Sequence, residues 1–228
     1  MSAELAQLLE EVILTPDQSL RVANETQLKK LSNENFLQFA GLLSSVLIDE
    51  NARLEARILA ALTLKNELVA KDSVKASQYA QRWITVVDPA SKDQIKLNTV
   101  QALLTGEPRV ANASAQLIAA IANIELPRGE WGDLMKTMVD STNPSQPENV
   151  KRASLLTLGY ICESADPQSQ VLVSSSNSIL IAIVQGAQSS EPSVAVRLTA
   201  LNALADSLVF IKNNMEREGE RNYLMQVV

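Results

Sequence analysis

The chain of 228 residues contains no histidine, and this absence removes the commonest general base and the commonest zinc ligand together. Cysteine occurs once, at Cys162, so neither an internal disulfide nor a site of several thiolates can form. Cys162 ends the apolar run 158–162, and without a base nearby we interpret it as a small buried hydrophobic residue rather than a nucleophile. We therefore expect no enzyme activity, no cofactor and no metal site.

Glycine and aromatic residues are also scarce, at 7 residues and 4% of the chain respectively. β-Sheets favour aromatic residues and their tight turns favour glycine, so this composition argues against a sheet protein. We predict an all-α fold.

Long hydrophobic runs and a surplus of basic residues are missing as well. No apolar run reaches the ~20 residues that a membrane-spanning helix needs, and Met1–Glu4 lacks the basic start of a signal peptide. The net charge is −6, whereas binding to a phosphate backbone needs clustered Lys and Arg. We expect a soluble intracellular chain that binds neither nucleic acid nor a membrane.

What the sequence does contain is one apolar signature in five copies. In each copy apolar residues recur at positions i, i+5 and i+8, which share one side of a helix at about 100° per residue. The copies begin at Leu20, Leu54, Val110, Val150 and Val196. The first copy is degenerate, because Glu25 takes its middle position. Each stripe is too narrow to form a core alone, and repetition at roughly 40 residues is typical of stacked two-helix repeats of the HEAT or armadillo kind.

These observations predict a right-handed α-solenoid of about five and a half HEAT repeats. The predicted helix pairs cover residues 1–32, 33–70, 88–125, 127–164 and 166–209, and residues 211–228 begin a sixth pair. The longest interval between copies holds an inserted helix at 73–87, which we expect Trp83 to anchor. The last residues, 225–228, are mostly apolar and lack a glycine cap, so we expect the chain to be an N-terminal segment of a longer solenoid.

A basic residue follows the start of the stripe in several copies, at Arg21, Lys151 and Arg197. Two interpretations remain open. The basic residues form a ladder of salt bridges between stacked turns, each worth well under ~1 kcal/mol, or they contact a ligand. We favour the salt-bridge ladder.

Several short runs resemble the N-terminal domain of the importin β family of nuclear-import receptors. The family resemblance is carried by residues 62–68, 71–72 and 81–83, which read LTLKNEL, KD and QRW, and it continues through GYICE at 159–163 and EGERNYLMQVV at 218–228. It covers essentially the whole chain and is closest to fungal members. The run from Lys65 to Trp83 is specific to the family, whereas the helix stripes would fit any HEAT protein.

The resemblance implies a receptor that carries cargo through the nuclear pore and releases it when GTP-bound Ran binds. In the family Ran lies against the second helices of the first few repeats. The matching positions here are Lys65, Asn66 and Lys71, with Arg109 and Arg152 as weaker candidates. Importin α and cargo are held mainly by later repeats of the family, which lie beyond Val228.

The family also binds Phe-Gly repeats of nucleoporins between the first helices of the fifth and sixth pairs. The matching positions are Leu180, Ile181, Val184, Glu220, Tyr223 and Leu224. The resemblance implies an apolar slot for a phenylalanine ring, with Glu220 at its rim. The alternative is that the same apolar residues pack into an ordinary core between helices.

We therefore expect a transport receptor segment that is found in the cytoplasm, in the nucleus and at the nuclear pore and envelope. The runner-up function is a HEAT-repeat scaffold of a phosphatase or a vesicle coat, because the same architecture supports a static assembly. Preference for GTP-loaded over GDP-loaded Ran separates the two, since a scaffold has no reason to bind either form.

Overall fold

The computed structural model describes residues 2–219, 221 and 222, and for residues 2 and 213–215 the backbone alone. The described part of the chain is helical and contains no strand. The helices are α1 (Ser2–Leu14), α2 (Gln18–Glu34), α3 (Phe36–Ile48), α4 (Leu54–Asn66), α5 (Ser73–Val86), α6 (Pro89–Leu103), α7 (Pro108–Glu125), the 3₁₀-helix η1 (Leu126–Arg128), α8 (Leu134–Asp140), α9 (Glu148–Ser164), α10 (Gln170–Ala187) and α11 (Val194–Glu216).

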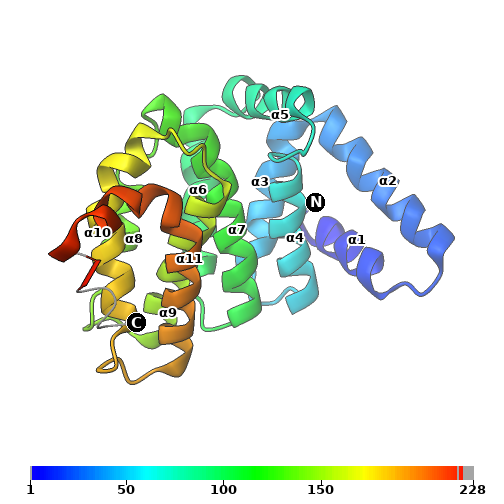
Figure 1. Ribbon diagram of the computed structural model, residues 1–228. Coiled ribbons are helices and arrows are strands. Elements are labelled where there is room, and N and C mark those ends of the chain that lie inside the picture. The colour runs from blue at the N-terminus through cyan, green and yellow to red at the C-terminus, as the bar shows by residue number, and fades with distance from the viewer. Residues whose placement is uncertain (1, 220, 223–228) are drawn as a thin grey trace. The chain divides into compact units, whose positions relative to one another are not determined.

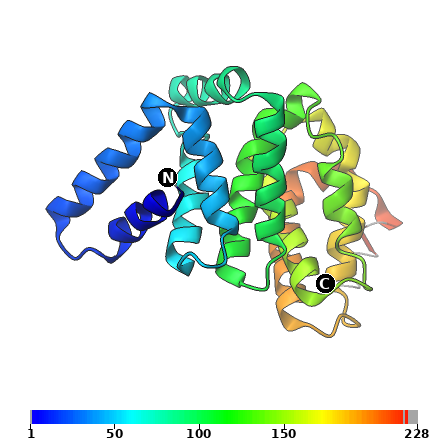
Figure 2. The same cartoon turned by 180° about the vertical axis from the view of Figure 1, so that it is seen from behind.

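The helices form two compact units, residues 1–117 and 118–228, whose boundary falls within α7. In the first unit α3 packs against α4 and α6, and α1 packs against α2, α3 and α4. In the second unit α11 packs against α9 and α10, and α8 packs against α9. Figures 1 and 2 show these helices from opposite sides. In both units a helix buries its apolar side only by lying beside others.

Aspartates start three of the helices in the first unit. Asp17, Asp72 and Asp88 each accept a hydrogen bond from a backbone N–H in the first turn of α2, α5 and α6. The side-chain hydroxyls of Ser19 and Ser91, together with these backbone groups, hold the pKa values of Asp17 and Asp88 below the usual range. Such N-caps satisfy backbone donors that have no partner inside the helix.

Basic side chains close the turns within helix pairs. Arg21 donates to the carbonyl oxygen of Thr15 at 3.1 Å, and Arg197 donates to that of Glu191. Lys151, which is buried, lies 2.5 Å from the equally buried carboxylate of Glu191. These contacts are internal to the fold, which argues against a ligand site. Of the three residues, Lys151 forms the expected salt bridge between repeats, whereas Arg21 and Arg197 bond backbone carbonyls of their own turns instead.

Helix α5 is anchored at one end of the first unit. Figures 1 and 2 show it lying crosswise to α3 and α4. Trp83 is fully buried and Val87, just beyond the helix, is 2% exposed. The indole and the valine therefore fix the helix by apolar packing, as expected for Trp83.

Helix α11 is longer than the sequence suggested. It runs without interruption to Glu216, past the break expected between residues 209 and 211, because no glycine or proline occurs from Val194 to Glu216 to stop it. Its outward side carries a stripe of exposed apolar residues, Val194, Leu198 and Leu201. The start of a separate sixth helix therefore does not fall at residue 211.

Helices α10 and α11 also differ from the expectation that no segment is apolar enough for a membrane. Among the described residues, Gln170–Ala187 and Val194–Lys212 are long and apolar enough to cross one by length and composition. The two helices pack against each other, and α11 also packs against α9. Apolar helices that bury one side in a protein core have the same composition as a spanning segment, so this finding is weak evidence for a membrane.

Gly186 of α10 lies at a point of close helix packing in the second unit. A Cβ there would lie 2.8 Å from Leu155 Cδ1 of α9 and 3.1 Å from Ala200 Cβ of α11. We expect Gly186→Val to lower the free energy of unfolding by about 2 kcal/mol, because overpacking forces neighbouring helices apart. Urea unfolding followed by circular dichroism measures this change.

Gly41 of α3 supplies the matched control, because a Cβ added there would meet nothing within 4 Å. Gly41→Ala should leave stability unchanged or raise it by up to ~1 kcal/mol, since alanine is the better helix former. Comparable losses in both variants would contradict the packing argument.

Candidate functional site

Three of the predicted partner-binding residues lie close together in the chain where α4 ends and α5 begins. Lys65 and Asn66 form the last turn of α4, and Lys71 lies in residues 67–72, which we call the connector. Asn66 and Lys71 are exposed and Lys65 is partly exposed. Within the described part of the chain neither lysine has an ion-pair partner. The two ammonium groups are therefore available to an acidic partner.

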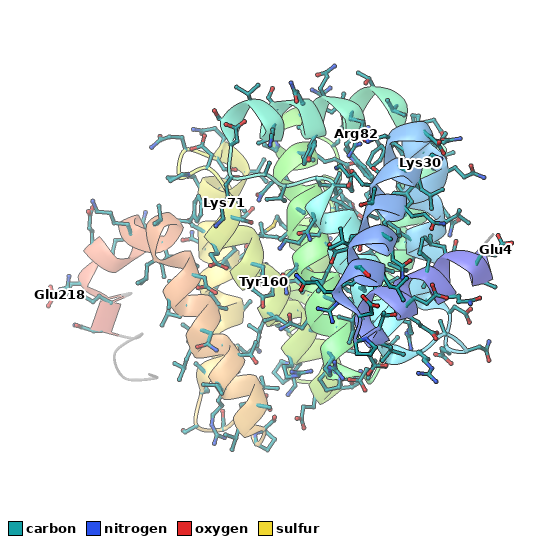
Figure 3. The ribbon with its side chains drawn as sticks, turned by 90° about the vertical axis from the view of Figure 1, so that its right-hand side faces the viewer. Glu4, Lys30, Lys71, Arg82, Tyr160 and Glu218 are labelled. Atoms are coloured by element: carbon teal, nitrogen blue, oxygen red, sulfur yellow. The ribbon has the colours of Figure 1, made fainter. Side chains whose placement is uncertain are left out.

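The start of the connector is fixed by a group of polar side chains around the buried carboxylate of Glu67, which we call the Glu67 cluster. It consists of Lys29 and Ser32 of α2, Glu67, and Arg82 of α5. The Glu67 carboxylate accepts hydrogen bonds from Ser32 Oγ at 2.6 Å, from Lys29 Nζ at 3.1 Å and from the Arg82 guanidinium. Arg82 also donates to the backbone carbonyl of Glu67 at 3.2 Å and to Ser32 Oγ at 3.3 Å. The cluster thus joins α2, the end of α4 and α5; Arg82 and Lys71 are labelled in Figure 3.

Aromatic rings complete the surroundings of Arg82. Its guanidinium carbon lies 3.9 Å from the centre of the Phe36 ring and 5.2 Å from that of Tyr79. Lys29 Nζ lies 5.5 Å from the Tyr79 ring centre. Because the π face of an aromatic ring attracts cations, the rings add to the stabilisation of both positive charges.

Glu67 remains ionised in this setting. Burial alone raises the pKa of its carboxyl group, but the hydrogen bonds from Ser32, Arg82 and Lys29 outweigh burial and hold the pKa below its usual range. Glu67 is 7% exposed. A carboxylate so buried is tolerated only while its donors stay in place.

Arg109 lies at the other end of α4. It is exposed near the start of α7, and its guanidinium is 3.7 Å from Glu55 in the first turn of α4. Ten residues of α-helix span about 15 Å, so Glu55 is about that far from Lys65. The structure thus does not bring Arg109 close to Lys65 or Lys71. Arg152 belongs to the second unit, in α9, and is partly buried beside the buried Lys151.

The residues expected to bind Phe-Gly repeats separate into two kinds. Leu180 and Val184 are buried and pack with Ile211, and Leu204 packs against them. Ile181 is 66% exposed. Glu220, Tyr223 and Leu224 lie outside the described residues, so one wall of the expected slot is not described. Leu180 and Val184 belong to the core between α10 and α11, and among the described members of the set Ile181 alone offers its side chain to a partner.

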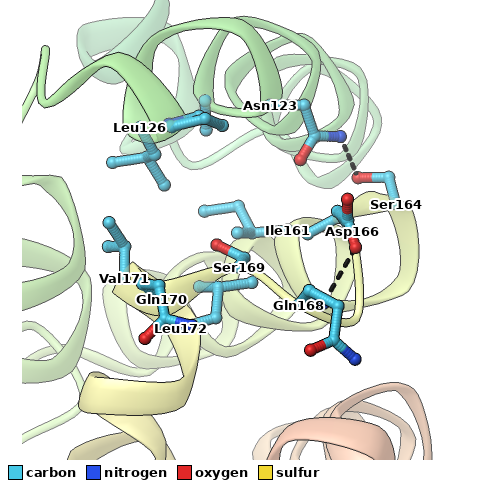
Figure 4. Close-up of a pocket in the computed structure, with 13 residues that line it drawn as sticks. Asn123, Leu126, Ile161, Ser164, Asp166, Gln168, Ser169, Gln170, Val171 and Leu172 are labelled. Atoms are coloured by element: carbon cyan, nitrogen blue, oxygen red, sulfur yellow. Dashed lines mark hydrogen bonds between the residues drawn. The ribbon is translucent and has the colours of Figure 1, made fainter.

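The second unit also contains a cavity of about 410 Å³ between the end of α7, η1, the end of α9 and the start of α10 (Figure 4). Its apolar lining includes Leu126, Ile161 and Leu172. Asn123 Nδ2 donates to Ser164 Oγ at 2.7 Å on its polar side. No sequence motif predicted this cavity, because it is built from the ends of four elements that are distant in the chain.

Chemistry at the single cysteine is suppressed. Burial, with a smaller effect of the nearby Asp206 carboxylate, raises the pKa of the Cys162 thiol to about 12. The thiolate that a nucleophile needs is therefore scarce at neutral pH. Among the described residues no group of three or more His, Cys, Asp or Glu side chains could hold a metal ion.

Sequence reasoning missed the Glu67 cluster. The available signal was that Glu67 and Arg82 are charged residues placed directly beside Leu68 and Trp83, which are buried. A charge next to buried apolar positions indicates a paired charge, because an unpaired one is too costly to bury.

Comparison with known proteins places these features in a family. Residues 24–105 match the model of the importin-β N-terminal domain. The chain is 77% identical over 227 residues to importin subunit beta-1 of Saccharomyces cerevisiae, which covers 100% of this chain and 26% of that protein. It is 43% identical over 216 residues to importin subunit beta-1 of Schizosaccharomyces pombe, covering 94% of this chain and 25% of that protein. The chain thus spans about a quarter of the length of these relatives.

Solved structures agree with the sequence relatives. One is a structure in which Kap95p binding induces the switch loops of RanGDP to adopt the GTP-bound conformation, with 76% identity and a TM-score of 0.95 over 99% of this chain and 26% of that chain. Another is the complex of Kap95 with Nup1, with 76% identity and a TM-score of 0.91 over the same shares. These structures are importin-β HEAT solenoids, which confirms the expected all-α solenoid class. The chain therefore belongs to the importin β family.

Proposed function

We propose that this segment belongs to a nuclear transport receptor that binds GTP-loaded Ran and Phe-Gly nucleoporins during protein import through the nuclear pore. The observation that carries the proposal is the 77% identity over the whole chain to importin subunit beta-1, whose yeast form, Kap95, has been solved with Ran and with Nup1. At this identity the surface side chains as well as the fold are largely shared.

The Ran surface consists of Lys65, Asn66 and Lys71 at the connector, with Arg109 and Arg152 as outlying contacts. The two accessible lysines suit an acidic face of a partner, although the whole chain carries a net charge of −6. Local cationic side chains steer association and set its salt dependence, whatever the net charge. Lys65, Asn66 and Lys71 therefore form the primary contact.

The nucleoporin surface is centred on Ile181 of α10. Its exposed, branched apolar side chain offers a contact for a phenylalanine ring. Leu180 and Val184 pack against α11 and hold α10 in place. Glu220, Tyr223 and Leu224 complete the slot in this proposal. Several weak contacts of this kind release quickly, as passage through a pore requires.

The remaining properties follow from this role. The receptor moves between the cytoplasm and the nucleus and is found at the nuclear pore and envelope. It is not an enzyme and needs no cofactor, and importin α and cargo are bound mainly by repeats beyond this segment.

Binding to Ran in its two nucleotide states tests the proposal. Immobilised chain should retain GTP-loaded Ran and retain GDP-loaded Ran much less. A chain that binds neither form would instead fit a HEAT-repeat scaffold of a phosphatase or a vesicle coat.

Charge reversal at the connector should weaken Ran binding. We expect Lys65→Glu with Lys71→Glu to raise the Kd for GTP-loaded Ran by roughly tenfold or more, because two attractive contacts become repulsive. Calorimetry at physiological salt measures the change. Lys30→Glu alters an exposed lysine of α2 and serves as the control. Equal losses per reversed charge in the two variants would mean that net charge, rather than the position of the lysines, governs binding.

Ile181→Asp should weaken binding to a Phe-Gly peptide by about tenfold and leave Ran binding unchanged, because a charge placed in an apolar contact must be desolvated. Fluorescence anisotropy of a labelled peptide measures the affinity. Val194→Asp is the matched control, since Val194 is 67% exposed against 66% for Ile181. Unchanged peptide binding by folded Ile181→Asp would remove Ile181 from the site.

A further inference from the structure

The Glu67 cluster holds the first residue of the connector, and few hydrogen bonds hold the residues that follow it. The turn after α4 is closed by hydrogen bonds from the N–H groups of Leu68 and Val69 to the carbonyl of Lys65, at 3.0 and 3.1 Å. Within the described residues, Ala70 and Lys71 make no hydrogen bond. The next fixed point is Asp72, which caps α5 through the N–H of Lys75 at 2.9 Å. Backbone bonding alone therefore leaves the connector free to shift.

Arg82 supplies the missing restraint across the connector. Arg82 lies in α5, which follows the connector. It binds both the carboxylate and the backbone carbonyl of Glu67, the first residue of the connector. Its planar fork also reaches Ser32 Oγ of α2. A guanidinium bound at several points in this way fixes orientation as well as distance.

The cluster is better suited to fixing geometry than to adding stability. A buried ion pair gains little net free energy, because desolvation offsets the attraction, but it is costly to break from one side only. The apolar residues next to the cluster are buried as well, since Leu68 is 3% exposed, Phe36 is 4% exposed and Trp83 is fully buried. Burial of these side chains favours a folded state, whereas the hydrogen bonds of the charged groups fix the direction of the chain at Glu67.

We propose that the Glu67 cluster is a positioning device that preorganises the connector, so that Lys65, Asn66 and Lys71 meet Ran without first having to be ordered. The inference rests on the proposed function. Arg82, Glu67 and Ser32 are positioning residues that act through the connector. Ser32 is 1% exposed and Glu67 is 7% exposed, so they act from beneath the surface that the partner touches.

The test replaces both charges together, because removing one alone leaves the other without its closest charged partner. In Glu67→Gln with Arg82→Met, the apolar anchors should keep the far-ultraviolet circular dichroism of the unaltered chain. The Kd for GTP-loaded Ran should rise about tenfold, since binding now includes the cost of ordering the connector side chains. Hydrogen exchange should become faster at residues 66–72 and stay unchanged in α3.

Ser32→Ala gives a second route to the same answer with little risk to folding. It removes the buried hydroxyl that bridges Glu67 and Arg82, and a residue so buried cannot touch Ran itself. The expected loss in affinity is smaller, about threefold, as for a single hydrogen bond.

Arg197→Met is the matched control, because Arg197 also binds a backbone carbonyl but lies in the second unit. It should reduce thermal stability without changing Ran affinity. Folded cluster variants that bind Ran as tightly as the unaltered chain would overturn the proposal, as would an equal loss in Arg197→Met. These outcomes differ from a failure of the proposed function, in which the unaltered chain itself would not bind GTP-loaded Ran.

Discussion

Side-by-side packing is the constraint on which the rest of this structure depends, because no helix in the described part of the chain buries its own apolar stripe. α3 lies against α4 and α6 in the first unit, and α11 lies against α9 and α10 in the second. One close approach between helices needs a residue without a side chain, at Gly186. Where a turn would expose a backbone carbonyl, a basic side chain from the following helix covers it, as Arg57 Nε does for Leu47 at 2.9 Å. Helix packing and the hydrogen bonds that basic side chains donate to turn carbonyls thus recur together along the chain.

The two proposed partner surfaces use this framework in different ways. At the first surface, one lysine lies in the last turn of α4 and the other on the short irregular connector, and the Glu67 cluster limits the freedom of the connector. On α10, the partner contact is a single exposed side chain of a helix whose other face is core. The first surface depends on a loop being held still, and the second on a helix that is already rigid.

Sequence periodicity predicted the helices because helix formation is local, and the caps are local as well. Asp17 and Asp88 precede their helices by one residue, and each bonds within its own first turn. Which side of α10 faces the core was not predictable in the same way. Leu180 and Ile181 are both apolar, and only the position of α11 makes the first buried and leaves the second exposed. The Glu67 cluster was missed for a related reason: Ser32 and Arg82 are 50 residues apart, and only the packing of three helices brings them together. The end of α11 was placed too early, at residue 209, whereas the helix continues to Glu216 because no glycine or proline stops it.

The two tryptophans of the chain fall one in each compact unit. Trp83 is completely shielded from solvent, whereas Trp131 is partly accessible and has a left-handed backbone with a φ of 55°. The indole emission of the first unit should accordingly be blue-shifted and protected from aqueous quenchers, and that of the second should be redder and open to them. Native fluorescence therefore distinguishes melting of one half of the chain from melting of the other, without any label.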